Sequence, residues 1–317
     1  MLKKLRLNQT DKFSFSIVTR DIVTMLTSFI DGRPHDISIG SEQGEISNWD
    51  DIVIYKANGI YENIQVKQQT TDFSDAACSI DKSQRGKISP LDETMKSLAA
   101  WLSVNDPEKS TPPRRFKIIL PEGAIKVKKE ITVNQFERLC NKETTNHTTL
   151  EGFEQLIKND VATKNICIWL QSWCDFPSNE LILRAVKRLE IIVTGNQLSI
   201  DEQSEKLISE YFKDVNIVIS LIHSFINEQS TYSSAISPRA LLNDLKNYLL
   251  PGVKKWTQYY LDKDVWKISG IHDTINAIES PSQTVPSLWN PNSEGILKLN
   301  ARTNSSNLAK AIIRLAF

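Results

Sequence analysis

The feature that most limits what this chain can fold into is an Asn-Gly pair between two segments of β-type composition. Residues 51–55 read Asp-Ile-Val-Ile-Tyr, and apolar and polar residues alternate along residues 60–68. β-branched and apolar residues in such runs favour strands. Asn58-Gly59 suits a two-residue type I′ turn, because both central residues of that turn have positive φ. We therefore predict an antiparallel hairpin.

The alternation along the second strand of this hairpin places polar side chains on one face. Gln65 and Lys67 are two positions apart, so they lie side by side on the same face. With the Asn-Gly pair as the turn, Asp50 stands opposite Lys67 and shares that face. A bulge of one residue would give this place to Asp51 instead, so both acids are candidates.

An acid, an amide and a lysine on one face suit the hydrolysis of a phosphodiester bond. Carboxylate and amide oxygens are ligands that Mg²⁺ accepts. A lysine on the same face can contact the attacking water or the scissile phosphate. On spacing alone, an amphipathic hairpin with a merely solvated polar face explains the pattern at least as well.

The hairpin region resembles a PD-(D/E)xK nuclease domain of the QxK variant. The resemblance is carried by the segment Trp-Asp-Asp-Ile-Val-Ile, a short glycine turn and the segment Ile-Gln-Val-Lys-Gln. The resemblance is to the CBASS-associated double-strand DNA endonucleases and to the Lamassu antiphage effector nuclease. It is specific over residues 50–67, and elsewhere only the order of elements agrees. The resemblance implies that Mg²⁺ or Mn²⁺ is bound by Asp50 or Asp51, Gln65 and the carbonyl of Val66, with Lys67 as the essential catalytic lysine.

An additional carboxylate often completes such a site. Glu42, Glu45 and Asp21 are within reach of this role, although the pattern favours a surface position for each of them. Gln65 stands where many related sites have an acid, and its neutral amide oxygen is a weaker metal ligand than a carboxylate.

The rest of the chain predicts an α/β fold. Apolar residues recur at helical spacing over 15–29, and Gly32 and Pro34 then supply a stop signal. Strands are expected at 36–39, 115–120 and 166–170; helices at 91–102, 204–211, 215–226 and 239–250; and a mainly helical segment at 181–193, with 189–193 as an alternative strand. With the resemblance, these elements imply a restriction-endonuclease-like mixed sheet flanked by helices.

We expect two domains, a nuclease domain at residues 1–235 and a smaller, mainly helical partner-docking domain at residues 236–317. The second segment contains Trp256, Trp266 and Trp289 and an apolar tail at 308–317. Tryptophans serve small cores and interfaces alike, so these residues form either a helical core or the docking surface.

Composition argues against several classes of protein. Lys plus Arg equals Asp plus Glu, with 38 of each, so total charge neither requires nor excludes a polyanionic partner. The four cysteines and four histidines lack the spacing of a zinc site, and no phosphate-binding glycine loop is present. Without a signal peptide or a long apolar run, we expect a cytoplasmic protein with free thiols and no membrane contact.

The expected partners follow from the resemblance. The residues after about 235 are too few for the nucleotide-sensing domain of a CBASS endonuclease. The Lamassu-like arrangement implies an effector subunit of a prokaryotic antiphage or antiplasmid complex, which degrades double-stranded DNA when an SMC-like or other ATPase sensor activates it, with homo-oligomerisation on activation. Two alternatives stay open: a catalytically degenerate nuclease fold that binds DNA or protein, and a stand-alone restriction endonuclease.

Overall fold

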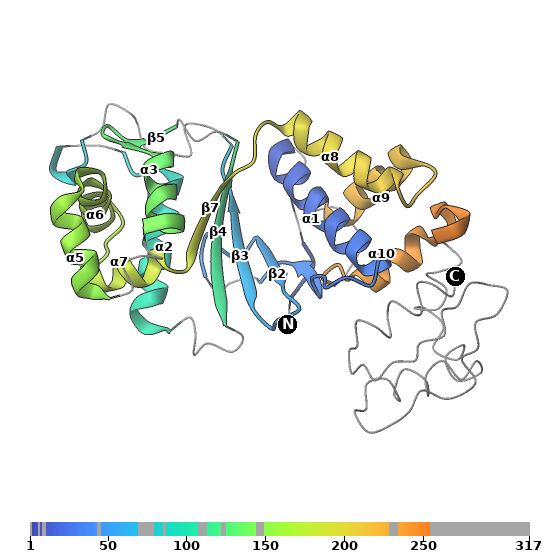
Figure 1. The fold of residues 1–317 in the computed structure, drawn as a ribbon, viewed down its shortest axis with the longest axis horizontal. Helices are drawn as coiled ribbons and strands as arrows, with labels where there is room; N and C mark the ends of the chain where they lie inside the picture. The colour runs from blue at the N-terminus through green and yellow to red at the C-terminus, as the bar shows by residue number, and fades with distance from the viewer. Residues whose placement is uncertain are drawn as a thin grey trace, which may run out of the picture.

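The computed structural model has a central β-sheet between two layers of helices (Figure 1). It describes residues 2–5, 7, 11–42, 46–68, 79–84, 87–106, 113–121, 125–143, 149–227 and 234–253. The predicted tryptophan-containing segment and the apolar tail at 308–317 lie outside these residues, as does Glu45.

The elements follow one another in a mixed order of helices and strands. The longer ones are α1 (Lys12–Ile30), β1 (Ser38–Gly40), β2 (Ile52–Tyr55), β3 (Tyr61–Val66), α2 (Pro90–Val104), β4 (Arg114–Leu120), α3 (Val133–Arg138), α5 (Leu150–Asn159), α6 (Val161–Trp173), α7 (Asn179–Val186), β7 (Leu189–Val193), α8 (Gln197–Ser209), α9 (Val215–Ile226) and α10 (Pro238–Leu245). The shorter ones are η2 (Lys82–Gln84), β5 (Lys126–Lys128), β6 (Ile131–Thr132), η3 (Leu139–Glu143) and η4 (Lys246–Tyr248).

The central sheet has five strands in the order β1-β2-β3-β4-β7. β2 pairs with β1 and β3 in antiparallel fashion, whereas β4 pairs in parallel with β3 and β7. The predicted mixed α/β sheet flanked by helices is therefore confirmed.

Each face of the sheet has its own hydrophobic core. Helices α1, α8, α9 and α10 cover one face, and α2, α3, α5, α6 and α7 lie on the other (Figure 1). Ile64 of β3 packs in the first core, while Phe116 and Ile118 of β4 pack in the second. Because side chains alternate along a strand, Gln65 and Lys67 lie on the face of β3 opposite to Ile64, toward α2.

Most of the predicted elements are present. The helices predicted at 15–29, 91–102 and 215–226 correspond to α1, α2 and α9, and the strand at 115–120 corresponds to β4. The alternative strand at 189–193 is the correct one, as β7.

The strand predicted at 166–170 is wrong, because this run belongs to α6. The buried residues of that helix are Thr163, Ile166, Cys167, Trp169, Leu170 and Trp173. Most of them recur three or four positions apart, which is the spacing of one helix face. A run of five apolar residues is too short to distinguish a strand from a buried helix by itself.

The hairpin is confirmed, but its turn differs from the prediction. The Lys56 N–H donates to the Ile60 carbonyl (2.9 Å) and the Gly59 N–H to the Lys56 carbonyl (3.0 Å), so residues 57–59 form a three-residue loop. Gly59 has φ of +81°, whereas Asn58 is not among the residues with positive φ. The type I′ turn is therefore wrong, and the loop is of the kind that places one glycine in the left-handed region.

The longer turn shifts the register by one residue. Ile52 pairs with Ile64 and Val53 with Asn63. The predicted pairing of Asp50 with Lys67 is therefore wrong. Extending the observed register beyond the start of β2 places Asp51 opposite Gln65, which is the arrangement expected from a one-residue bulge.

Both edges of the sheet are hydrogen-bonded within the chain. At β1, the backbone of Ile39 exchanges bonds of 2.9 and 2.8 Å with Ile236, and Lys3 pairs likewise with Ser41. At β7, the side-chain amide of Asn141 donates to the Ile191 carbonyl (2.8 Å) and accepts from its N–H (3.3 Å). A side chain thus takes the place of a neighbouring strand there.

We predict that Gly40→Ala destabilises the fold. A methyl group at Gly40 would overlap the carbonyl oxygen of Lys3 and approach the Cβ of Ala235 to 2.8 Å, so the backbone has to shift. Such overpacking costs about 1–3 kcal/mol, measurable as a lower midpoint of urea unfolding. Gly252 is the matched control, since a methyl group there meets nothing within 4 Å. Equal stability of the Gly40 and Gly252 variants would contradict the close approach.

The layer on the α2 side contains a fully buried ion pair. Asp92 of α2 and Lys128 of β5 are both 0% exposed, and their charged groups are 2.9 Å apart. The Asp92 carboxylate also accepts from the Trp169 indole N–H (2.8 Å) and from the Ser89 backbone (2.9 Å). The Lys128 ammonium lies 3.4 Å from the centre of the Trp173 ring. Both oxygens of this carboxylate thus accept from buried donors.

The end of the described chain packs on the α1 side. Ile236, Leu241, Leu242, Leu245 and Leu249 share the core of α1. The helix predicted at 239–250 is present as α10 followed by η4. The division of the chain between residues 235 and 236 stays a prediction.

Two further expectations concern membrane-spanning helices and the state of the cysteine thiols. Among the described helices, α1 alone is long and apolar enough to cross a bilayer, but 72% of its apolar stretch is buried inside the protein, as in a core helix. The thiols of Cys140, Cys167 and Cys174 are buried, and none of the three forms a disulfide with another described residue. Burial raises the pKa of Cys167 to about 12, so this thiol stays protonated.

Candidate functional site

Gln65 is the centre of the candidate site. Strand β3 holds it between β2 and β4, where it lies beside Ile118, and it is only 7% exposed. Its side-chain amide has no hydrogen-bond partner among the residues that the structure describes. The polar atoms of this amide are not among the described side-chain atoms that are both fully buried and without a hydrogen bond, so they are open to solvent or to a ligand.

If the register of β2 and β3 is continued one residue before β2, Asp51 comes opposite this amide. Asp51 directly precedes β2, and directly opposed residues of an antiparallel pair point to the same face. Asp50, one position earlier, is directed by the same alternation toward the other face. The Asp51 side chain is exposed, but neighbouring protein atoms desolvate it enough to raise its pKa, the Asp50 carboxylate raises that pKa further, and Lys67 opposes the shift. Asp51 is therefore close to both charges.

Lys67 and the Val66 carbonyl are the remaining members of the candidate site. The Lys67 N–H donates to the Ile119 carbonyl of β4 (2.9 Å). In a trans peptide the carbonyl points away from the N–H, so the Val66 carbonyl is directed toward the side of β3 where Asp51 lies. Lys67 is half-buried and shares the face of Gln65.

The structure places two of the three candidates for an additional acid elsewhere. The Glu42 carboxylate is buried and forms a two-pronged ion pair with the Arg114 guanidinium. Asp21 lies on α1, across the sheet from Gln65, beside Arg20 and under the influence of Lys117 and Glu62. Burial raises the pKa of Asp21, and Arg20 opposes that shift. Neither carboxylate faces the site, and Glu45 lies outside the described residues.

The donors on this face are all oxygen atoms, which is the ligand type that Mg²⁺ and Mn²⁺ prefer. Asp51 supplies a carboxylate, Gln65 an amide oxygen and Val66 a main-chain carbonyl. Among the described residues no group of three or more His, Cys, Asp or Glu side chains is placed to hold a metal. The residues present fit a hard divalent cation only if amide, carbonyl and phosphate oxygens complete its shell.

Sequence reasoning missed the buried polar side chains beneath the site. Asn63 is 0% exposed, and it bonds both to the main chain beside the acids and to Arg114. The sequence could have indicated Asn63, because it stands two positions before Gln65 and therefore on the same face of the strand. The pairing of Glu42 with Arg114 had none, because the two residues are 72 positions apart.

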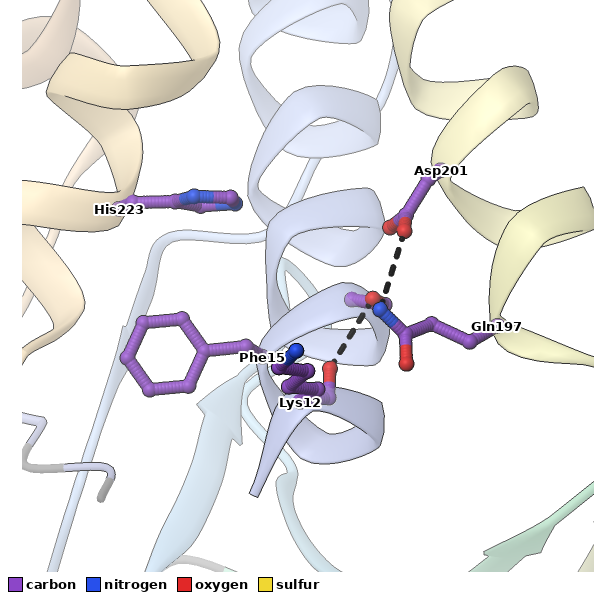
Figure 2. Close-up of a pocket in the computed structure, with 6 residues that line it drawn as sticks. Lys12, Phe15, Gln197, Asp201 and His223 are labelled. Atoms are coloured by element: carbon purple, nitrogen blue, oxygen red, sulfur yellow. Dashed lines mark hydrogen bonds between the residues drawn. The ribbon is translucent and has the colours of Figure 1, made fainter. Parts of the chain in front are cut away.

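A separate cavity of about 360 Å³ lies on the other side of the sheet, against α1. Its lining is Lys12, Phe15, Ser16, Gln197, Asp201 and His223. Figure 2 shows Gln197 and Asp201 reaching from α8 toward α1, with Gln197 donating to Asp201 (3.3 Å). Burial lowers the pKa of His223, so its imidazole is neutral near pH 7. None of the residues predicted for the site lines this cavity.

Comparison with models of protein families gave no match, and comparison with curated proteins gave no significant match.

Proposed function

We propose that this protein is a metal-dependent DNA endonuclease of the PD-(D/E)xK type in its QxK form. The observation that carries the proposal is the Gln65 amide, which makes no hydrogen bond to a described residue and shares a face of β3 with Lys67, with Asp51 next to Ile52 at the start of β2. An amide open to a ligand, with a carboxylate and a lysine close by, provides the groups that metal-dependent phosphodiester hydrolysis needs.

Each residue has a distinct role in this proposal. Asp51, Gln65 and the Val66 carbonyl hold Mg²⁺ or Mn²⁺ against a DNA phosphate. When bound, the cation stabilises negative charge that develops on the phosphate oxygens. Lys67 positions the attacking water or stabilises the scissile phosphate through its positive charge. Asp50 raises the negative potential that attracts the cation without being a required ligand.

The sheet order and its two helical layers are compatible with a restriction-endonuclease-like fold, which we include in the proposal. The substrate would be double-stranded DNA, and the setting an effector subunit of an antiphage or antiplasmid complex in the cytoplasm. An SMC-like or other ATPase would then supply the activating signal, and homo-oligomerisation on activation is compatible with this arrangement. These parts rest on the sequence resemblance.

The test is cleavage of duplex DNA by the full chain, alone and together with the protein encoded beside it. We expect fragments of many lengths in Mg²⁺ or Mn²⁺ and intact DNA in EDTA, because the donors of the site cannot act without a cation. DNA that is retarded in a gel but never cut would indicate a degenerate nuclease that only binds. A few discrete fragments would indicate a restriction enzyme instead.

A further inference from the structure

Three polar side chains are buried directly beneath the candidate site. Glu42, Asn63 and Arg114 are 7%, 0% and 5% exposed. They come from the segment after β1, from β3 and from β4. Charged groups this far from water are costly unless they are paired and hydrogen-bonded.

The three side chains form a continuous chain of bonds. The Arg114 guanidinium pairs with both carboxylate oxygens of Glu42 and donates to the Asn63 side-chain oxygen (3.3 Å). The guanidinium also lies 5.4 Å from the centre of the Tyr61 ring. The paired groups satisfy one another, so their burial is compatible with a stable core.

Both ends of this chain of bonds reach the main chain just before Asp51. The Asn63 side-chain amide donates to the Trp49 carbonyl (2.8 Å). The Glu42 backbone N–H donates to the Asp50 carbonyl (2.9 Å). Two consecutive carbonyls are thus held by groups that Arg114 connects.

The Trp49 side chain fixes the same segment from the other side. Its indole N–H donates to the Thr94 carbonyl of α2 (2.9 Å), and its ring meets Phe116 edge to face. Packing of the Trp49 ring fixes the distance of residues 49–51 from the core on the α2 side. The hydrogen bonds to the Trp49 and Asp50 carbonyls fix the rotation of the backbone in this segment. The rotation matters because β2 begins only at Ile52, so no strand pairing holds Asp51.

We infer that Asn63, Glu42 and Arg114 are positioning residues that hold Asp51 opposite Gln65. The effect of these residues on metal binding and cleavage rests on the proposed function. The hydrogen bonds that hold the segment before Asp51 do not depend on that function. Without the Asn63 bond, the segment at Asp50 and Asp51 is expected to rotate or fray, and the two ligands then separate. Groups that orient metal ligands from behind typically contribute tenfold or more to metal affinity.

The test compares Asn63→Ala with Asn141→Ala in the full chain. The two asparagines are matched, because each donates to a main-chain carbonyl at 2.8 Å and also accepts a bond. We expect Asn63→Ala to weaken Mn²⁺ binding about tenfold or more, measured by calorimetry, while Asn141→Ala leaves it unchanged. Near-ultraviolet circular dichroism confirms that both are folded. Asn63→Thr, which suits a strand, replaces Asn63→Ala if that variant does not fold.

A second measurement does not depend on metal. Opposed residues have Cβ atoms about 4.5–5.5 Å apart, within a small movement of disulfide range, so Asp51→Cys with Gln65→Cys should form a disulfide in a Cys78→Ser background when diamide is added as the two-electron oxidant. Adding Asn63→Ala should slow that bond at least severalfold, and adding Asn141→Ala should not. Equal effects of the two asparagine changes on both measurements would overturn the inference. Absence of Mn²⁺ binding in the wild type, with cross-linking still dependent on Asn63, would overturn the proposed function instead.

Discussion

Asp51→Asn is expected to abolish metal-dependent DNA cleavage, with a loss of at least about 100-fold, whereas Asp50→Asn retains most of the activity. The reason is the register of the hairpin, which, continued before Ile52, brings Asp51 opposite Gln65 and turns Asp50 toward the other face. Removing the Asp51 charge deprives the cation of its carboxylate. Removing the Asp50 charge weakens only a long-range attraction.

Two controls accompany the comparison of Asp51→Asn with Asp50→Asn. Lys67→Met should lose activity as Asp51→Asn does but retain Mn²⁺ binding, because the lysine acts on the water or the phosphate and not on the metal. Unfolding midpoints of all variants should stay close to the wild-type value, since none of these side chains packs in the hydrophobic cores. Loss of activity in Asp50→Asn with full activity in Asp51→Asn would refute the assignment of the acid.

Lys128→Met is expected to cost about 3–5 kcal/mol of stability, which is a large part of the total for a domain. The change removes the partner of a carboxylate that is 0% exposed, so Asp92 is left charged in the core or must take up a proton. Asp92 also bonds Trp169 and the backbone of Ser89, and both bonds weaken if its charge is lost. Urea unfolding measures the effect.

The exposed pair of Lys96 and Asp175 provides the matched control. Their charged groups are 2.6 Å apart, closer than those of Asp92 and Lys128, but both side chains are 48% exposed. Lys96→Met should change stability little, because water and ions screen an exposed pair. The double variant Asp92→Leu with Lys128→Met should be more stable than Lys128→Met alone, since it leaves no unpaired charge. Equal effects of the two lysine changes would show that burial does not govern the strength of the pair.

Local patterns in the sequence predicted the elements whose apolar residues repeat over several turns or alternations. α1, α2 and α9 are of this kind, as are the two strands of the hairpin. The register of that hairpin was not readable, because the sequence does not show whether Ala57 belongs to the strand or to the loop. A single residue there decides between Asp50 and Asp51.

Interactions between distant segments were also beyond sequence reasoning. The partners in the buried pairs Glu42 with Arg114 and Asp92 with Lys128 are 72 and 36 residues apart. Nothing in the local composition of either partner indicates the other. These pairs decide which carboxylates are available to a ligand, and so the expected role of Glu42 as an additional acid could be judged only from the fold.

The closed edges of the sheet bear on how copies of this protein can associate. Ile236 and Lys3 pair with β1 and the residue after it, and Asn141 bonds Ile191 of β7, so backbone groups at both edges of the described sheet are already engaged within the chain. We expect any assembly to join side-chain surfaces of helices and loops. Contacts between side-chain surfaces can dissociate readily. A β-sheet shared between copies would be more stable and would favour irreversible, fibre-like assembly.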